Sequence, residues 1–472
     1  MTSSPLWTSA DAVEATGGQA NGNWTATGVS IDTRTLKLGD LFVAITGPNF
    51  NGHTFVHAAF EAGARGAIVA DRESNILNGK PGLIVADPLE ALKDLAAAAR
   101  QRTAAKVVAI TGSVGKTSTK AALAHVLSRQ GKVCSSQNSL NNHWGLPLSV
   151  ARLPKKAGFG VFEIGMSQPG EITPLTELAQ PDVAIITAIA PAHMKFFKST
   201  EDIARAKAEI FLGLSNGIAI INRDTEHFDL LRSRALGTGA AEIYSYGRST
   251  KADMQLIECT SDAEGNLIEA RWKGRTIRYL VRQPGVQWGS NSLAVLAATN
   301  ALEGDLDAAA NDLSTLPSIP GRGSIHVIPW GLGTIHLIDD SYNANPDSVC
   351  AALETLGKIH PKNGRRVAIL GDMLELGDMS KFAHVKLKEQ IEINAIDVVF
   401  LAGREITALA DVLDPSCLAA LAETAEGIMP EILGGLRPGD VVTVKASNQM
   451  GMGRVVETLI NPDVHPHATN VH

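Results

Sequence analysis

A glycine-bearing segment with a lysine and a threonine is the part of the chain best suited to chemistry. It reads AKVVAITGSVGKTST over residues 105–119. An apolar run, Val107–Ile110, predicts a buried strand before the turn, and a helix-forming stretch follows from Ser118 to about Arg129. This order is typical of a loop that binds the phosphates of a nucleotide triphosphate, because glycines let backbone N–H groups approach phosphate oxygens.

The side chains of this loop suggest how a nucleotide would be held. Lys116 is expected on the β- and γ-phosphates, and the Thr117 hydroxyl is expected to help hold Mg²⁺. The usual spacing requires a glycine at position 110, where this chain has Ile110. A chance Gly-Lys-Thr in an ordinary strand-turn-helix is the alternative, but the strand, turn and helix signals agree with one another. We predict nucleotide contacts from Gly112, Ser113, Val114, Gly115, Lys116, Thr117 and Ser118.

Further polar side chains stand where predicted strands end, which is where an open α/β sheet binds its ligands. Glu163 interrupts an apolar strand, and beside a phosphate loop a magnesium ligand is favoured over a capping carboxylate. His193 follows a strand and a proline; a metal ligand or base and a merely solvated histidine both stay open. The run Asp339–Ser348 (DDSYNANPDS) suits ligand contact better than helix capping alone. Lys207, on a predicted amphipathic helix over 205–211, has the spacing of a surface residue.

Composition excludes several classes of protein. With 472 residues, the chain is too long for one core and predicts two to four domains. A net charge of −7 argues against general nucleic-acid binding, and no apolar run is long enough for a membrane span. The N-terminus lacks the pattern of a signal peptide, and the four cysteines are far apart, without metal-ligand spacing. A reducing cytoplasm is therefore expected.

The pattern along the chain predicts an α/β protein of three domains. Residues 1–104 alternate short strands with Ala-rich helices. Residues 105–316 predict a P-loop-type, mostly parallel sheet, with antiparallel strands added from Tyr244 to Arg282. A Pro- and Gly-rich linker spans 316–323. Strands and helices then alternate again, so residues 317–472 predict a Rossmann-like domain.

Taken together, these segments resemble the Mur ligases, the ATP-dependent amide-forming enzymes of peptidoglycan synthesis. The T-G-x-x-G-K-T loop with Ile110 is that family's variant, and the resemblance covers nearly the whole chain in the expected order. Asp339–Ser348 and Leu370–Gly377 (LGDMLELG) are similar to the member that adds D-alanyl-D-alanine. Ser30–Arg34 and Asn51–His53, in the latter of which Asn replaces a more usual Asp, resemble the family's UDP-sugar-binding domain.

The resemblance implies roles that spacing alone does not. Glu163, His193 and Thr117 would be magnesium ligands. Lys207 matches the family's lysine that is carbamylated by CO₂ and supports a second Mg²⁺, which reverses its surface interpretation. With Lys116, the residues Glu163, His193 and Lys207 form the expected catalytic group. The remaining implied contacts are Asn291, Arg322 and Asp340 for ATP, Ser30, Asp32, Thr33, Arg34, Asn51, Gly52 and His53 for the UDP-sugar, Asn141 and Asn142 for the UDP-linked peptide, and Asn343 and Asn345 for substrate in the third domain.

Two further departures from the family pattern concern ligand contacts. Gln287-Trp288 stand where many relatives have His-Asn, so that Trp288 offers a stacking ring in place of a hydrogen-bonding amide. Lys445-Ala446-Ser447-Asn448 stand where relatives often have Lys-Gly-Ser-Arg. This second departure weakens any assignment of Lys445 or Asn448 to D-alanyl-D-alanine binding.

The implied reaction joins UDP-N-acetylmuramoyl-tripeptide to D-alanyl-D-alanine through an acyl phosphate, with ATP converted to ADP and phosphate. ATP, two Mg²⁺ ions and carbamylated Lys207 are expected, in a cytoplasmic monomer that binds neither nucleic acid nor membrane. The nearest alternative is a ligase of the same architecture that adds a single amino acid, such as the diaminopimelate-adding or folylpolyglutamate enzyme. A regulator that binds ATP and a UDP-sugar without ligating them is a further alternative, and binding alone needs no second metal.

Overall fold

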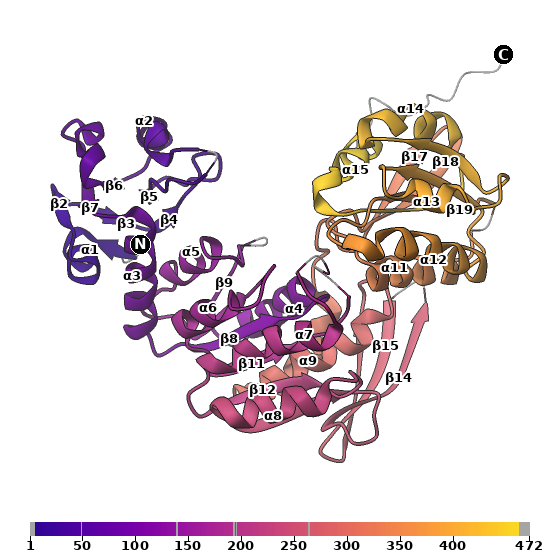
Figure 1. Ribbon diagram of the computed structural model, residues 1–472. Helices are drawn as coiled ribbons and strands as arrows, with labels where there is room; N and C mark the ends of the chain where they lie inside the picture. Colours follow the sequence, from indigo (N-terminus) through magenta and orange to yellow (C-terminus); the bar gives the residue numbers. More distant parts are fainter. Residues whose placement is uncertain are drawn as a thin grey trace.

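The computed structural model describes residues 5–48, 50–137, 140–191, 194, 196–262, 265–361 and 363–461. Three α/β bodies follow one another along the chain, and the first and third stand apart above the second (Figure 1). Each body contains its own large sheet, so the predicted three-domain α/β architecture is confirmed. Among the described residues, no helix has the length and apolar character needed to cross a membrane.

The first body is a five-stranded sheet in the order β2-β7-β6-β5-β4, parallel except for β2, beside a two-stranded β1-β3 ribbon. The helices predicted near His57–Ala64 and Leu89–Arg102 are present with ends shifted by a few residues at most. The bounds are β1 (Trp7–Thr8), α1 (Ser9–Thr16), β2 (Gln19–Asn21), β3 (Thr25–Ala26), β4 (Gly28–Ser30), β5 (Asp40–Val43), α2 (Val56–Glu61), β6 (Gly66–Ala70), β7 (Gly82–Val85) and α3 (Pro88–Gln101).

The second body is a nine-stranded sheet in the order β16-β15-β14-β13-β12-β11-β8-β10-β9. Strands from β9 to β14 pair in parallel, and β14, β15 and β16 pair antiparallel, as the alternating pattern predicts. The bounds are β8 (Lys106–Thr111), α4 (Lys116–Ser128), β9 (Val133–Ser135), α5 (Gly145–Ala151), β10 (Phe159–Glu163), α6 (Ile172–Ala179), β11 (Val183–Ile186), α7 (Thr200–Lys207), β12 (Gly217–Asn222), α8 (Phe228–Thr238), β13 (Ala240–Gly247), β14 (Met254–Asp262), β15 (Gly265–Trp272), β16 (Arg275–Val281), α9 (Gln287–Ala301) and α10 (Leu306–Asp312).

The third body is a six-stranded sheet in the order β17-β18-β22-β19-β20-β21, parallel except for the β17–β18 hairpin. The sequence does not predict the two edge strands, β17 and β21. The bounds are β17 (Ser324–Trp330), β18 (Gly333–Asp339), α11 (Pro346–Lys358), β19 (Arg366–Gly371), α12 (Ser380–Ile393), β20 (Val398–Ala402), α13 (Thr407–Ala410), β21 (Leu418–Ala422), α14 (Ala425–Gly435), β22 (Val441–Lys445) and α15 (Gly453–Ile460).

The first and second bodies share one hydrophobic core. Helix α3 packs on α5, and buried residues such as Leu95 of the first body and Phe162 of the second belong to the same cluster. Trp7 Nε1 donates a hydrogen bond to the carbonyl of Ala151 at 2.9 Å, across the junction. The third body has separate cores of its own. The first two bodies are therefore expected to behave as one unit to which the third is attached.

The linker to the third body is anchored at both ends. Gln283 of the second body donates to the carbonyl of Leu316 at 2.5 Å. On the other side, Gly321 N donates to Asp339 Oδ2 at 2.8 Å, and Gly321, with φ of +71°, completes a turn after Pro320. The stretch from 318 to 320 lies between the anchors. A rotation of the third body is therefore expected to be concentrated there.

The shared core makes a prediction for thermal unfolding. Leu95→Ala removes fully buried methyl groups and should cost about 2–5 kcal/mol. In calorimetry, the transition of the first two bodies should move to lower temperature while that of the third stays in place. Leu387→Ala, in the core of the third body, is the matched control and should do the reverse. A single transition that both variants lower equally would contradict two independent units.

Candidate active site

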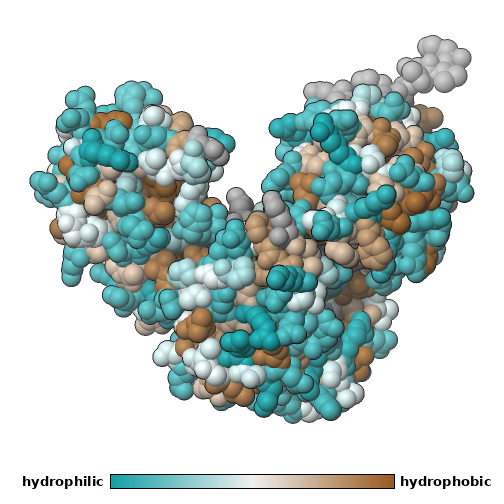
Figure 2. All heavy atoms as spheres, in the orientation of Figure 1, coloured by the Kyte–Doolittle hydropathy of each residue, from teal (hydrophilic) through white to brown (hydrophobic). Residues whose placement is uncertain are grey.

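A cleft of about 950 Å³ lies between the second and third bodies. A broad hollow above the second body separates the first body from the third (Figure 2). No described residue of the first body lines the cleft. The lining residues from the second body include the phosphate loop 113–118, Asn141, Glu163, Gln287 and Asn291, and those from the third include Asp340, Asn343, Asn345 and Lys445, with Arg322 from the linker.

The phosphate loop joins the end of β8 to α4 and is fixed to the neighbouring strand β11. Thr187 Oγ1 donates to the carbonyl of Val114 at 2.5 Å. Gly112 has φ of +155°, and a Cβ there would overlap Thr187 Oγ1. Gly115 has φ of +84° and caps α4, which begins at Lys116, two residues earlier than predicted. Backbone N–H groups at the start of α4 are therefore available for an anion.

Lys116 is folded back onto its own loop. Its Nζ donates to the carbonyl of Gly112 at 2.7 Å. Burial lowers the pKa of Lys116; the nearby Glu163 carboxylate acts against this shift, and the charge of Arg322 adds to it. The ammonium is thus held where a phosphate group would relieve the cost of its burial.

Glu163 lies at the carboxyl end of β10 and is buried. Thr117 Oγ1 donates to Oε2 at 2.8 Å, and Asn141 Nδ2 donates to Oε1 at 2.7 Å. Lys120 Nζ lies 3.8 Å from Oε2. The structure thus brings Thr117, Glu163 and Asn141 together. Lys120 was missed, although it stands four residues after Lys116 and so on the same face of α4. Asn142 Oδ1 instead accepts from Gly145 N at 2.9 Å, at the start of α5.

Lys207 is buried at the last position of α7, with 2% of its surface exposed. The surface interpretation from spacing is therefore wrong, because the Lys207 side chain is turned into the protein, near Lys116 of the phosphate loop. Burial lowers the pKa of Lys207 well below its usual range, and the charge of Lys116 adds to the effect. Within the described part of the chain, the Lys207 ammonium has no hydrogen-bond acceptor and no carboxylate partner. His193 lies outside the described residues.

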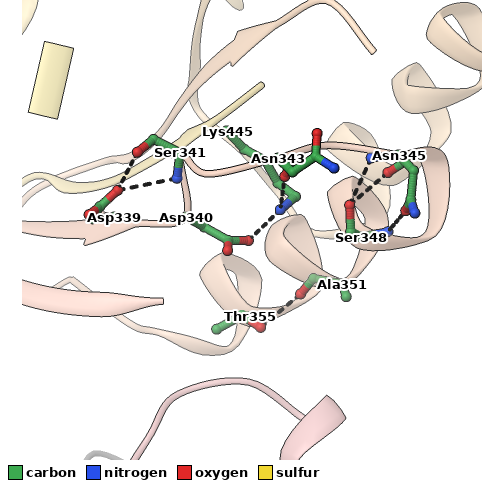
Figure 3. Close-up of polar contacts among 9 residues, drawn as sticks. All are labelled: Asp339, Asp340, Ser341, Asn343, Asn345, Ser348, Ala351, Thr355 and Lys445. Carbon is green, nitrogen blue, oxygen red and sulfur yellow. Dashed lines mark hydrogen bonds and ion pairs between the residues drawn. The ribbon is translucent and has the colours of Figure 1, made fainter. Parts of the chain in front are cut away.

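The segment after β18 divides its polar side chains between support and the cleft (Figure 3). Asp339 is buried and accepts from Ser341 Oγ at 2.6 Å as well as from the linker. Asp340 lines the cleft and forms an ion pair with Lys445, Nζ to Oδ2 at 2.6 Å. Asn345 caps α11, accepting from Ser348 N at 2.9 Å. Asn343 contributes its carbonyl to Lys445 at 3.0 Å.

The expected adenine and ribose contacts lie on both sides of the cleft. Asn291, on α9, lies against Gly115 of the phosphate loop. Trp288 is buried in the core of the second body, so little of its ring is free to stack on a base. Arg322 lies over the ring of Tyr342, with 4.3 Å from its guanidinium carbon to the ring centroid. Arg322 therefore belongs with the third body.

The residues predicted to bind a UDP-sugar lie in the first body. Asp32 and Arg34 form an ion pair of 2.6 Å after β4. Asn51 Oδ1 accepts from His53 N at 3.0 Å, and His53 Nε2 accepts from Ala70 N at 2.9 Å. Burial lowers the pKa of His53, which suits a neutral ring that accepts a hydrogen bond. Ser30, Thr33 and Gly52 lie in the same two segments. Their ligand contacts stay a prediction.

Comparison with known proteins adds three family matches and close structural relatives. Residues 110–299 match the Mur ligase middle domain, residues 326–448 the Mur ligase glutamate ligase domain, and residues 25–100 the Mur ligase family catalytic domain. The UDP-N-acetylmuramoyl-tripeptide–D-alanyl-D-alanine ligase of Rickettsia prowazekii (strain Madrid E) is 31% identical, over 96% of this chain and 99% of the relative.

Two solved structures extend this similarity to the fold. MurF from Acinetobacter baumannii superimposes with a TM-score of 0.83 at 28% identity, covering 97% of this chain and 99% of that chain. MurF ligase from Thermotoga maritima, in complex with ADP, superimposes with a TM-score of 0.75 at 27% identity, covering 91% and 96%.

The tight contact at Gly112 makes a prediction for nucleotide binding. Gly112→Ala would place a methyl group against Thr187 and force a strained backbone, so the loop should shift. We expect ADP affinity, measured by calorimetry, to fall about tenfold or more. Gly274→Ala is the matched control, because Gly274 also has positive φ, at +89°, but open space around it. Equal affinity in wild type and Gly112→Ala would show that the loop geometry is unimportant.

Proposed function

The chain belongs to the Mur ligase family, and we propose that it is the member that joins D-alanyl-D-alanine to UDP-N-acetylmuramoyl-tripeptide. The observation that best supports this is the cleft itself, in which a phosphate loop faces the DDSYNANPDS segment. The similarity to ligases named for this reaction covers nearly the whole chain. We place the reaction in the cytoplasm, where ATP is available, and expect a monomer.

The reaction needs two successive displacements. A carboxylate oxygen of the tripeptide attacks the γ-phosphorus of ATP, and ADP leaves, which gives an acyl phosphate. The amine of D-alanyl-D-alanine then attacks the acyl carbon, phosphate leaves, and the nitrogen loses a proton. Lys116 and the N–H groups at the start of α4 would hold the transferring phosphoryl group and balance its charge.

The oxygen donors beside the loop fit a magnesium ion. Thr117 and Glu163 offer a hydroxyl and a carboxylate 2.8 Å apart, and Mg²⁺ prefers oxygen ligands together with phosphate oxygens and water. Asn141 would keep the second carboxylate oxygen in place. Bound Mg²⁺ would neutralise charge on the phosphates. His193 completes the proposed set by resemblance.

Lys207 suits carbamylation for a physical reason. An amine reacts with CO₂ only in its neutral form, and burial of Lys207 favours that form. Formation of the N–C bond releases one proton and leaves an anion. The charge of Lys116 disfavours an ammonium at Lys207. A carbamate anion at the same position would instead balance that charge. It would also provide oxygen ligands for a second Mg²⁺.

The two segments typical of the D-alanyl-D-alanine ligase meet in the third body, which favours this member over one that adds a single amino acid. Leu374 N, in the LGDMLELG segment, donates to Ser447 Oγ at 2.8 Å. Ser447 Oγ in turn lies 3.4 Å from the carbonyl of Ala344, in the DDSYNANPDS segment. One serine therefore joins both segments beside the cleft.

The decisive experiment measures phosphate release from ATP and Mg²⁺ with UDP-N-acetylmuramoyl-tripeptide, with and without D-alanyl-D-alanine. We expect release that requires both substrates and a product heavier by the dipeptide. Lys116→Met should reduce the rate by at least about 100-fold, because the transferring phosphoryl group loses its cation. Lys93→Met, at an exposed helix position, is the control. Release with a single amino acid instead of the dipeptide would move the assignment to a sister ligase, and saturable binding without release would indicate a regulator.

Carbamylation is tested directly with ¹³C-labelled bicarbonate. We expect a carbamate carbonyl signal in the NMR spectrum of the wild-type protein near neutral pH, and its loss in Lys207→Met. Ligation should slow in CO₂-depleted buffer and recover when bicarbonate is added. Lys93→Met should keep the signal. Full ligation by wild type in CO₂-depleted buffer, without a carbamate signal, would contradict the assignment.

A further inference from the structure

An ion pair between a buried lysine and a partly exposed aspartate joins the ends of two neighbouring strands of the third body. Lys445 is the last residue of β22, and Asp340 follows β18, the strand that pairs with β22 in parallel. Lys445 Nζ lies 2.6 Å from Asp340 Oδ2 and 3.0 Å from the carbonyl of Asn343 (Figure 3). The Lys445 side chain is 3% exposed, and that of Asp340 is 24% exposed. The more accessible partner is thus the carboxylate.

Stability alone does not account for this pair. Moving an ammonium out of water is costly, and well-packed apolar residues of similar size often stabilise a protein as well as a buried ion pair does. A pair at this position therefore suggests a role in binding. Both residues line the cleft that contains the phosphate loop, and Arg322 approaches the same carboxylate.

The pair leaves one oxygen of Asp340 for a ligand. Among the described residues, Oδ2 accepts from Lys445, whereas no hydrogen bond reaches Oδ1. Burial raises the pKa of Asp340, and the Lys445 ammonium acts against that rise. Lys445 therefore keeps the carboxylate ionised and fixes its orientation. A ligand hydroxyl that donates to Oδ1 would meet a charged acceptor already in place.

We infer that Lys445 is a positioning residue for the nucleotide ribose: it holds Asp340 so that Oδ1 accepts a hydrogen bond from a ribose hydroxyl. The inference depends on the proposed function for the identity of the nucleotide. It gives Lys445 a role on the ATP side of the cleft and does not require contact with the dipeptide. Through the Asn343 carbonyl, the same lysine also holds the turn that leads into α11.

The test compares ADP with 2′-deoxy-ADP and 3′-deoxy-ADP in binding calorimetry with Mg²⁺. Wild type should bind ADP about tenfold more tightly than at least one deoxy analogue, because a hydrogen bond to a charged acceptor is lost. In Lys445→Met, ADP affinity should fall to the level of that analogue, whose own affinity should change little. Lys445→Arg, which keeps the charge, should retain part of the preference. A preference that is unchanged in Lys445→Met would overturn the inference.

Three controls separate a positioning role from the alternatives. Asp340→Asn should abolish the ribose preference, and adding Lys445→Met to it should have no further effect on that preference. Lys388→Met removes an exposed lysine of the same body and should leave it intact. If Lys445→Met lowers affinity for all three nucleotides equally, or instead raises the KM for D-alanyl-D-alanine with the ribose preference intact, the inference fails. If the proposed function itself is wrong, the wild-type protein will not ligate D-alanyl-D-alanine, whatever its ribose preference.

Discussion

The hydrogen bonds of one buried carboxylate, Asp339, hold the end of the linker against the third body's side of the cleft. Asp339 accepts from the backbone N–H of Gly321 through Oδ2 and from Ser341 through Oδ1. Its own carbonyl accepts from Gly323 N at 2.7 Å. These bonds join the end of the linker to the end of β18. Arg322, Asp340 and the turn that follows are consequently parts of one assembly, which can approach the phosphate loop only as a whole.

Charge in the cleft is unbalanced until a ligand arrives. Lys116 and Arg322 add positive charge, and Glu163 is already shared between Thr117 and Asn141. Burial lowers the pKa of Lys116, and the charge of Arg322 adds to this shift, so the Lys116 ammonium is held at a cost. The phosphates of a nucleotide supply the missing anions. The buried positive charge that is costly by itself therefore also favours the binding of ATP.

The sequence allowed the central elements to be predicted much better than the edges and the buried cations. Strands such as β8, β11 and β12 are continuous apolar runs, because helices cover both faces of a parallel sheet. β17 contains Pro329 and β21 is rich in alanine, and edge strands need no such apolar run.

In the candidate site, residues that form a local pattern could be predicted, whereas residues that depend on tertiary contacts could not. The phosphate loop could be predicted because its residues are consecutive. Lys207 could not be placed from spacing, because its burial depends on how α7 packs against its neighbours, among them α8. Lys120 and the Lys445–Asp340 pair depend on contacts between residues far apart in the chain, which no local pattern reports.

The division of the molecule into a rigid pair and one attached body follows from what the chemistry requires. The acyl phosphate of the proposed reaction must be kept from water, yet both substrates must be able to enter. The first two bodies share a core, so we expect the distance between the segments predicted to bind a UDP-sugar in the first body and the phosphate loop in the second to change little. The third body has its own cores and a short linker anchored at both ends. Movement of that body alone would change access to the cleft, and it would carry Arg322, Asp340 and Lys445 toward the phosphate loop in a single step.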